Sequence, residues 1–154
     1  MTEKELLIHN KFLDICEIIA SFSHCTSIKV GCILVKNNRI ISTGYNGTPA
    51  GSDNCDDIFV NNFDREIHHA FSESCEIHAE INAIITAARY GISIENSYLY
   101  TNIQPCSNCL KTICNSGISK IVYRKKYDKA NYSKELINML NKLHIDLKQI
   151  DKVN

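Results

Sequence analysis

Residues 77–91 read I-H-A-E-I-N-A-I-I-T-A-A-R-Y-G. Apolar residues recur here at the spacing of one helical face, and glycine at 91 is a stop signal, so the stretch predicts a helix over residues 78–90. His78 and Glu80 are two residues apart, and at that spacing side chains of a regular helix point to nearly opposite faces. This limit does not apply in the first turn, where the helix is frayed and its geometry is not regular. Both side chains can therefore reach the space above the helix end, where free backbone N–H groups also point.

A second chemical motif is P-C-S-N-C, at residues 105–109. Cys106 and Cys109 lie where a short helix over residues 107–116 is predicted to begin, and the free N–H groups and dipole of a helix start favour thiolate. A Cys-x-x-Cys pair can chelate zinc, and His78 would be a third ligand. Three protein ligands leave one tetrahedral position for water, which is the arrangement of catalytic zinc sites.

Glu80 is the candidate for proton transfer at this site. A hydrolytic reaction must take a proton from water and deliver it to the group that leaves, and one carboxylate beside the metal can serve as general base and general acid in turn. Taken singly, a histidine at a helix start can be a cap, and a Cys-x-x-Cys pair can be structural. The two motifs together, with Pro105 directly before Cys106, favour the metal site.

The rest of the chain alternates helices and strands. An amphipathic helix is predicted over residues 4–22, and β-rich runs at 29–36 and 39–46 flank Asn37-Asn38, a pair suited to the positive φ of a hairpin turn. Residues 47–75 are rich in Gly, Asn, Asp and Ser and are predicted to form a long irregular loop. The remaining predictions are strands at 97–102, 120–124 and 145–150 and a helix at 132–143. This order implies one α/β domain over residues 1–154, with a mixed five-stranded sheet covered on both faces.

Composition narrows the classes of function. Lys plus Arg and Asp plus Glu number 17 each, and a net charge of zero argues against binding of nucleic acid or membrane through a broad basic field. The N-terminus lacks the order of a signal peptide, and no apolar run approaches the ~20 residues of a membrane span. We therefore expect a cytoplasmic protein, in which the eight cysteines are core thiols and metal ligands.

Several stretches resemble the cytidine deaminase superfamily and, within it, the deoxycytidylate (dCMP) deaminases. They include K-V-G-C-I-L-V, R-I-I-S-T-G-Y-N-G-T-P-A-G, C-E-I-H-A-E-I-N-A-I, P-C-S-N-C and S-G-I-S-K-I-V-Y, all between residues 25 and 128. The order H-x-E … P-C-x-x-C is the signature of zinc-dependent nucleobase deaminases. The motif G-Y-N-G-x-P-x-G, together with H-A-E-x-N-A-I, resembles the dCMP branch.

This resemblance implies a three-layer α/β/α fold and zinc-dependent hydrolysis of dCMP to dUMP and ammonia, which would supply thymidylate synthesis. It implies Zn²⁺ bound by the three ligands named above, with Glu80 as the proton shuttle. By the same resemblance, Asn46 would hydrogen-bond the sugar, and the backbone N–H of Ala79 would hydrogen-bond the carbonyl group of the base.

The resemblance also implies a homohexamer that is activated by dCTP and inhibited by dTTP, with Mg²⁺ accompanying the effector. Gly44, Tyr45, Asn46 and Gly47 would contact the effector, and the alternative for this motif is an ordinary turn after a strand. Thr86 stands where some regulated members carry an aromatic residue, a departure that bears on the effector response.

Two other functions compete. A tRNA adenosine deaminase would share the chemistry, but the zero net charge opposes it, and Lys29 before V-G suits the phosphate of a small nucleotide better than an RNA track. The alternative for Lys29 is a solvated charge at a strand end. A non-enzymatic zinc-binding module would have a closed four-ligand site and no need for Glu80.

A surplus of soft ligands predicts a second, structural zinc at Cys25, Cys55 and His68. Some dCMP deaminases that this chain resembles carry such a site at the matching positions. Residues 47–75 hold few large apolar groups, so a metal could order this loop by tying it to the segment before the first strand. Free thiols and surface histidines are the competing interpretation. The fourth ligand is open: the candidates are Asp64, one helical turn before His68, and His69, Cys75 and His24.

Overall fold

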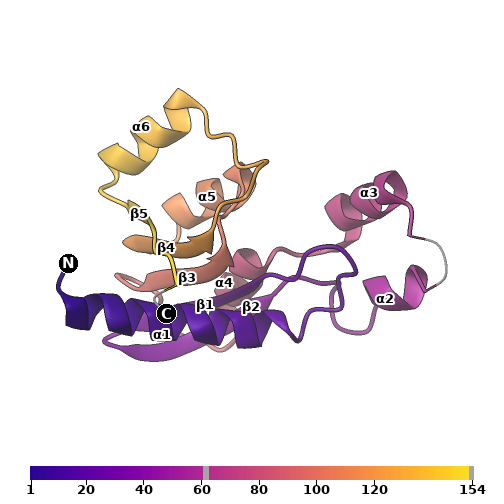
Figure 1. The fold of residues 1–154 in the computed structure, drawn as a ribbon, viewed down its shortest axis with the longest axis horizontal. Helices are drawn as coiled ribbons and strands as arrows, with labels where there is room; N and C mark the ends of the chain where they lie inside the picture. Colours follow the sequence, from indigo (N-terminus) through magenta and orange to yellow (C-terminus); the bar gives the residue numbers. More distant parts are fainter. Residues whose placement is uncertain (61–62, 153–154) are drawn as a thin grey trace.

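The computed structural model describes residues 1–60 and 63–152, and its centre is a five-stranded sheet (Figure 1). The strands are β1 Gly31–Lys36, β2 Arg39–Tyr45, β3 Tyr98–Ile103, β4 Lys120–Lys125 and β5 Asp146–Gln149. They lie in the order β2-β1-β3-β4-β5. Strand β1 is antiparallel to β2 and β3, whereas β4 is parallel to β3 and β5. The predicted mixed sheet is confirmed.

Helices cover both faces of this sheet. Helix α1 Glu3–Ala20 packs on one face, where its Leu13 and Cys16 join a core with Ile33 of β1. The other face is covered by α4 Ala79–Arg89 and α5 Ser107–Cys114, with α6 Lys134–Lys142 packed beside them in a core that includes Cys32. Successive strand residues point to opposite faces, so neighbours in β1 enter different cores. The predicted three-layer α/β/α fold is confirmed.

The hairpin between β1 and β2 turns at Asn37 and Asn38, whose φ angles are 52° and 58°. Asparagine tolerates this left-handed region better than most residues, which is why the sequence located the turn correctly. At the start of β1, an ideal Cβ on Gly31 would lie 2.1 Å from the carbonyl oxygen of Cys16. Glycine is therefore needed there for α1 to approach the sheet.

The prediction of an irregular loop over residues 47–75 is wrong, because this segment contains α2 Cys55–Ile58 and α3 Arg65–Cys75. Asp64 caps α3 by accepting hydrogen bonds from the N–H groups of Glu66 and Ile67. The segment also orders apolar rings, since Phe59, Phe63 and Phe71 cluster around His68. Figure 1 shows α2 and α3 together beyond one end of the sheet.

The other predicted helices and strands are found within two residues of their predicted bounds. Among the described helices, none has the length and apolarity that crossing a membrane requires.

Candidate metal and catalytic site

Two helix N-termini converge at the first candidate site. His78 is the N-cap of α4 and Cys106 is the N-cap of α5, and both have extended backbone angles. A residue at this position is not yet held in the helix, so its side chain can turn across the helix end. Glu80, at the second helical position, can reach the same space. The prediction made from the two-residue spacing therefore holds in the structure.

The three predicted ligands lie together. The Nδ1 atom of His78 is 3.4 Å from Sγ of Cys106 and 3.3 Å from Sγ of Cys109, and all three ligand atoms are within 4.8 Å of one another. Tetrahedral zinc, with bonds of about 2.3 Å to sulfur and about 2.0–2.1 Å to nitrogen, holds a sulfur and a nitrogen about 3.6 Å apart. The donor set and its spacing therefore fit Zn²⁺ with little rearrangement.

The charges at this cluster suit a cation. A hydrogen bond with Cys109, with a further one from His78, lowers the pKa of the Cys106 thiol to about 3. The hydrogen bond to Cys106 in turn raises the pKa of His78 to about 9. A thiol whose pKa is lowered loses its proton readily, and thiolate is the form of cysteine that binds a divalent cation.

Glu80 is buried beside the ligands, with 4% of its surface exposed and its Oε2 atom 3.6 Å from Sγ of Cys109. Burial raises the pKa of Glu80, which brings this carboxyl group closer to neutral pH than an exposed glutamate. A carboxyl group with a raised pKa next to a metal can both accept and donate protons.

A cleft of about 520 Å³ opens beside these residues. One wall is α3, through His69, Ser72 and Glu73, and further walls come from the start of α5 and from the segment after β4, which contributes Tyr127 and Lys129. None of these five residues was predicted to line a cleft: His69 was named only as a candidate ligand of the second zinc, and Ser72 and Glu73 were missed with α3. Tyr127 and Lys129 follow the carboxyl end of a parallel strand, where ligands commonly bind, and that rule could have found them.

The other predicted substrate contacts are the backbone of Ala79 and the side chains of Asn46 and Lys29, and they differ in whether they are free to bind a ligand. The backbone N–H of Ala79 begins α4 and so has no partner within the helix. The side-chain amide of Asn46 donates to the carbonyl of Ile28 and accepts from the N–H of Val30, at 2.9 and 2.8 Å, which leaves one N–H and one lone pair for a ligand. Lys29 is exposed and, among the described residues, is not part of the cleft lining.

The predicted effector motif, residues 44–47, covers the last two residues of β2 and the two residues that follow the strand. Gly44 packs against α4, Tyr45 is partly exposed, and Gly47 pairs with Ile77 through two backbone hydrogen bonds. The carbonyl of Tyr45 accepts a 2.8 Å hydrogen bond from the side chain of Asn82 in α4. Thr86 is half-buried on the same helix.

The second predicted metal cluster is also assembled. Sγ of Cys25, Sγ of Cys55 and a ring nitrogen of His68 all lie within 4.8 Å of one another, and all three residues are buried. Sγ of Cys25 is 3.6 Å from Nε2 of His68. Cysteines and histidine from three separate segments, buried together and free of disulfides, match the donor chemistry of a structural zinc site.

Each of the four predicted candidates for the fourth ligand has another contact or lies elsewhere than in this cluster. The carboxylate of Asp64 caps α3, His24 pairs with Asp56 at 2.8 Å, Cys75 is exposed and His69 lines the cleft. Glu76 was not considered from the sequence. Its Oε1 atom is buried with no hydrogen-bond partner, and its charge is close enough to raise the pKa of Cys25, after the larger effect of burial.

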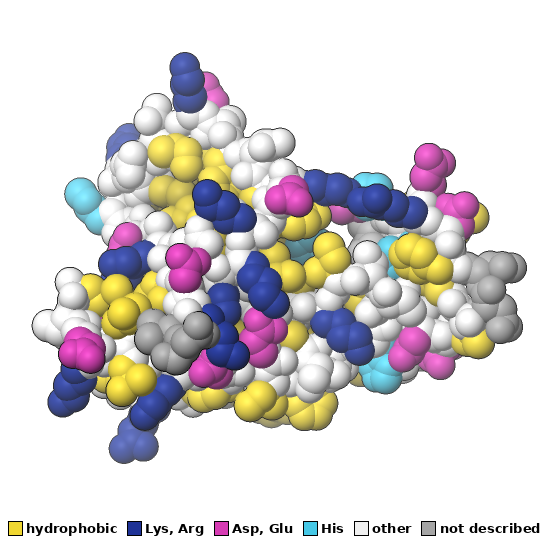
Figure 2. Space-filling model, in the orientation of Figure 1, with side chains coloured by type: hydrophobic (Ala, Val, Ile, Leu, Met, Phe, Trp, Pro, Cys, Tyr) yellow, Lys and Arg dark blue, Asp and Glu magenta, His cyan; other side chains and the backbone are white. Residues whose placement is uncertain are grey.

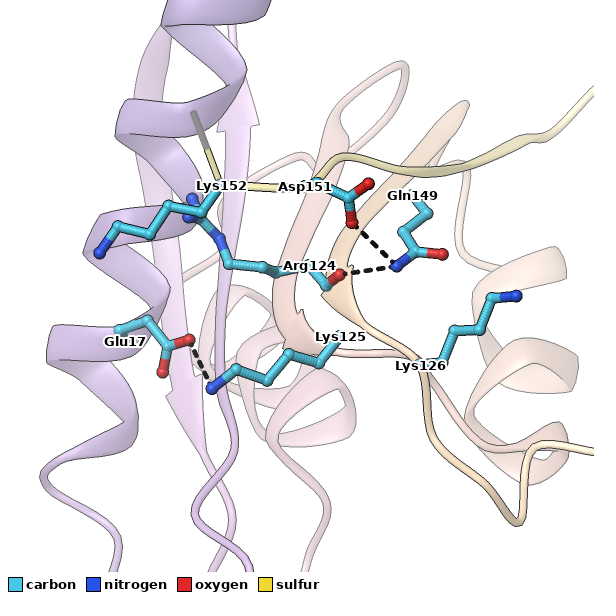
Figure 3. Close-up of a pocket in the computed structure, with 7 residues that line it drawn as sticks. All are labelled: Glu17, Arg124, Lys125, Lys126, Gln149, Asp151 and Lys152. Carbon is cyan, nitrogen blue, oxygen red and sulfur yellow. Dashed lines mark hydrogen bonds and ion pairs between the residues drawn. The ribbon is translucent and has the colours of Figure 1, made fainter. Parts of the chain in front are cut away.

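A second cleft, of about 550 Å³, is lined mainly by basic residues and shares no lining residue with the first (Figure 3). It is lined by Glu17, Arg124, Lys125, Lys126, Gln149, Asp151 and Lys152. Arg124 is paired with Asp14 and Lys125 with Glu17, both at 3.1 Å, so two of its four cations are already paired. Figure 2 shows acidic side chains interspersed with the Lys and Arg side chains on the face that it draws. We assign no ligand to this cleft.

Comparisons with known proteins agree with this geometry. The sequence profile described as "Cytidine and deoxycytidylate deaminase zinc-binding region" matches residues 7–125. The deoxycytidylate deaminase of Enterobacteria phage T2 is 41% identical over 149 residues, covering 76% of this chain and 79% of that protein. The deoxycytidylate deaminase of Enterobacteria phage T4 is 40% identical, covering 76% and 77%.

A solved structure is similar over almost the whole chain. The dCMP deaminase of cyanophage S-TIM5 in complex with dCMP and dUMP superposes with a TM-score of 0.74 at 29% identity, covering 97% of this chain and 98% of that one. The range matched by the family profile includes His78, Glu80, Cys106 and Cys109. The chain belongs to the cytidine and deoxycytidylate deaminase family.

Proposed function

We propose that this chain is a zinc-dependent dCMP deaminase, which converts dCMP and water to dUMP and ammonia. The observation that carries the proposal is the buried Glu80 beside a three-ligand cluster at the foot of a nucleotide-sized cleft. The phage relatives named deoxycytidylate deaminase and the S-TIM5 complex with dCMP and dUMP support the choice of substrate.

His78, Cys106 and Cys109 would hold Zn²⁺, which when bound supplies a Lewis acid that makes water nucleophilic near neutral pH. Glu80 accepts a proton from the attacking water and delivers it to the ring nitrogen of cytosine. A second proton passes through the same carboxyl group to the amino group, which leaves as ammonia, so one residue acts as base and then as acid. Its burial keeps competing water away from the carboxylate.

The N–H of Ala79 would donate to the base carbonyl, since helix-start N–H groups suit an oxygen acceptor there. Asn46 would contact the sugar through the N–H and lone pair that its bonds to Ile28 and Val30 leave over. Because those bonds fix the amide plane, the free donor and acceptor have a set direction.

The second cluster would hold a structural zinc at Cys25, Cys55 and His68. His68 lies on α3, whose His69, Ser72 and Glu73 line the cleft, so this metal would hold one wall of the substrate site.

The effector response would act through residues 44–47, with dCTP and Mg²⁺ as activator and dTTP as inhibitor. Asn82 holds the carbonyl of Tyr45, and it lies two residues after Glu80 in α4. A ligand that moves this motif would therefore also pull on the helix that carries the proton shuttle. We further propose a cytoplasmic homohexamer that supplies dUMP for thymidylate synthesis.

A tRNA adenosine deaminase is the alternative, and the zero net charge disfavours it. The test measures turnover of dCMP, CMP, cytidine, dCTP and a tRNA anticodon stem, together with the zinc content of the protein. Adding dCTP–Mg²⁺ or dTTP to the dCMP reaction tests the effector response, and light scattering tests the hexamer. Turnover of dCMP above the others supports the proposal. Turnover of the RNA alone, or zinc without any turnover, would reject it.

A further inference from the structure

Lys129 is the one lysine or arginine among the described residues that line the cleft beside the zinc-ligand cluster. Its side chain is exposed, and within the described part of the chain it enters none of the ion pairs. A substrate that carries a phosphate needs a cation at the mouth of its cleft, and an unpaired lysine can provide a compact point charge without first breaking another bond.

The segment that carries Lys129 is fastened to the loop that carries Cys106. The N–H of Tyr127 donates to Oε1 of Gln104 at 3.3 Å, and the hydroxyl of Tyr132 donates to the carbonyl of Pro105 at 2.6 Å. The hydroxyl of Ser107 donates to the carbonyl of Asn131 at 3.4 Å. Three contacts on four consecutive residues of the metal loop therefore fix the distance between that loop and the base of the lysine.

The backbone at Lys129 is itself a compact turn. The N–H of Ala130 donates to the carbonyl of Tyr127 at 2.8 Å, and the N–H of Asn131 donates to the carbonyl of Lys129 at 2.9 Å. A turn with both ends anchored gives a long side chain a fixed origin, which lowers the entropy lost when its ammonium group settles on a ligand.

We propose that Lys129, rather than Lys29, binds the 5′-phosphate of the substrate and makes the enzyme select a nucleotide over a nucleoside. This inference rests on the proposed dCMP deaminase activity and names its phosphate contact. Lys29 stays exposed outside the cleft lining, whereas Lys129 lies on the cleft wall that follows β4, joined to the metal loop.

The test compares kcat/KM for dCMP and deoxycytidine in the zinc-loaded wild type, Lys129→Ala, Lys129→Arg, Lys126→Ala and Lys29→Ala. Loss of one charge-assisted contact should lower the preference for dCMP about 10- to 100-fold in Lys129→Ala. Lys129→Arg should restore most of it. Lys126→Ala removes an exposed charge three residues away, outside this cleft, and should retain the wild-type preference.

Three results would overturn the inference: an equal loss for both substrates in Lys129→Ala, an unchanged preference in that variant, or loss of the preference in Lys29→Ala instead. Failure of the proposed function looks different. In that case the wild type itself would not turn over dCMP, which rejects both claims, whereas an active wild type with any of the three results rejects only the role of Lys129.

Discussion

An ideal Cβ atom on Gly44 would lie 2.3 Å from the carbonyl oxygen of Ala79 and 2.4 Å from the backbone nitrogen of Ala83. Strand β2 therefore contacts the first turns of α4, the helix whose N-cap is His78 and whose first turn carries Glu80. Both opposing atoms belong to the backbone of a helix, so neither can move alone. The glycine that opens the G-Y-N-G motif thus seats the catalytic helix, whatever ligand the motif also binds.

Gly44→Ala should destabilise the protein by about 3 kcal/mol, because overpacking against backbone forces α4 to shift. For a chain of this size that corresponds to a melting temperature about 10 °C lower. Zinc content should fall as His78 moves. Gly47→Ala is the matched control from the same motif, since the space around its Cβ is open, and its melting temperature should stay near that of the wild type. A Gly44→Ala protein with normal melting and zinc content would refute the seating role.

Glu80→Gln should retain the fold and bind zinc while losing about 10²–10⁴-fold in kcat for dCMP. The amide matches the carboxyl in size but cannot accept and release a proton. Elemental analysis checks the metal, and steady-state kinetics check the rate. Turnover near the wild-type level in a zinc-loaded variant would remove Glu80 from the mechanism. Cys106→Ser, by contrast, should lose the metal itself.

Cys25→Ser should lower the zinc content from about two to about one per chain, because it removes one of the three ligands of the second cluster. Asp64→Asn is its control: asparagine still caps a helix, so α3 and both metals should persist. Elemental analysis and KM for dCMP are the measurements. We expect KM to rise in Cys25→Ser, since α3 carries His68 and lines the cleft. About two zinc ions per chain in Cys25→Ser would reject the second site.

Glu73→Gln should raise kcat/KM for dCTP relative to dCMP by about three- to tenfold. Glu73 lines the cleft from α3, and every phosphate beyond the first adds negative charge that this carboxylate repels. Comparing both substrates in the wild type and the variant isolates this effect from any general loss. An unchanged ratio would mean that the carboxylate does not face the phosphates.

His9 should make stability depend on pH. It is buried, and Tyr100 hydrogen-bonds its Nδ1 atom at 2.8 Å. Burial lowers the pKa of His9, the neighbouring Lys120 and Lys148 lower it further, and Glu5 and Asp146 act in the opposite direction. The unfolded chain therefore takes up a proton below pH ~6.5 that the folded chain resists, so stability is full above that pH and falls as the pH drops.

His9→Gln has no proton to gain at this position. Between pH 7.5 and pH 5.5 the wild type should accordingly lose more melting temperature than the variant does, with both proteins zinc-loaded and compared by calorimetry. The same loss in the two proteins would assign the acid sensitivity to other groups, such as the metal ligands.

The sequence alone determined the elements that local chemistry controls. Two asparagines sufficed for the hairpin turn, and the helix starts at His78 and Cys106 were readable because capping and chelation act within a few residues. The alternation of strands with helices gave the mixed sheet and its two covered faces, since each predicted helix must bury an apolar face against it.

Only the tertiary structure decided which distant residues share the clefts. Asp64 looked like a ligand from its spacing to His68, yet its carboxylate caps α3, and the partnerless buried oxygen belongs to Glu76. Likewise Lys29 lies close to a family motif in sequence, but Lys129 lies on the cleft wall. The residues that line this cleft are up to sixty positions apart, from His69 to Lys129. Their proximity depends on how α3, α5 and the segment after β4 pack together, and the energy of that packing is spread over many side chains rather than contained in one motif.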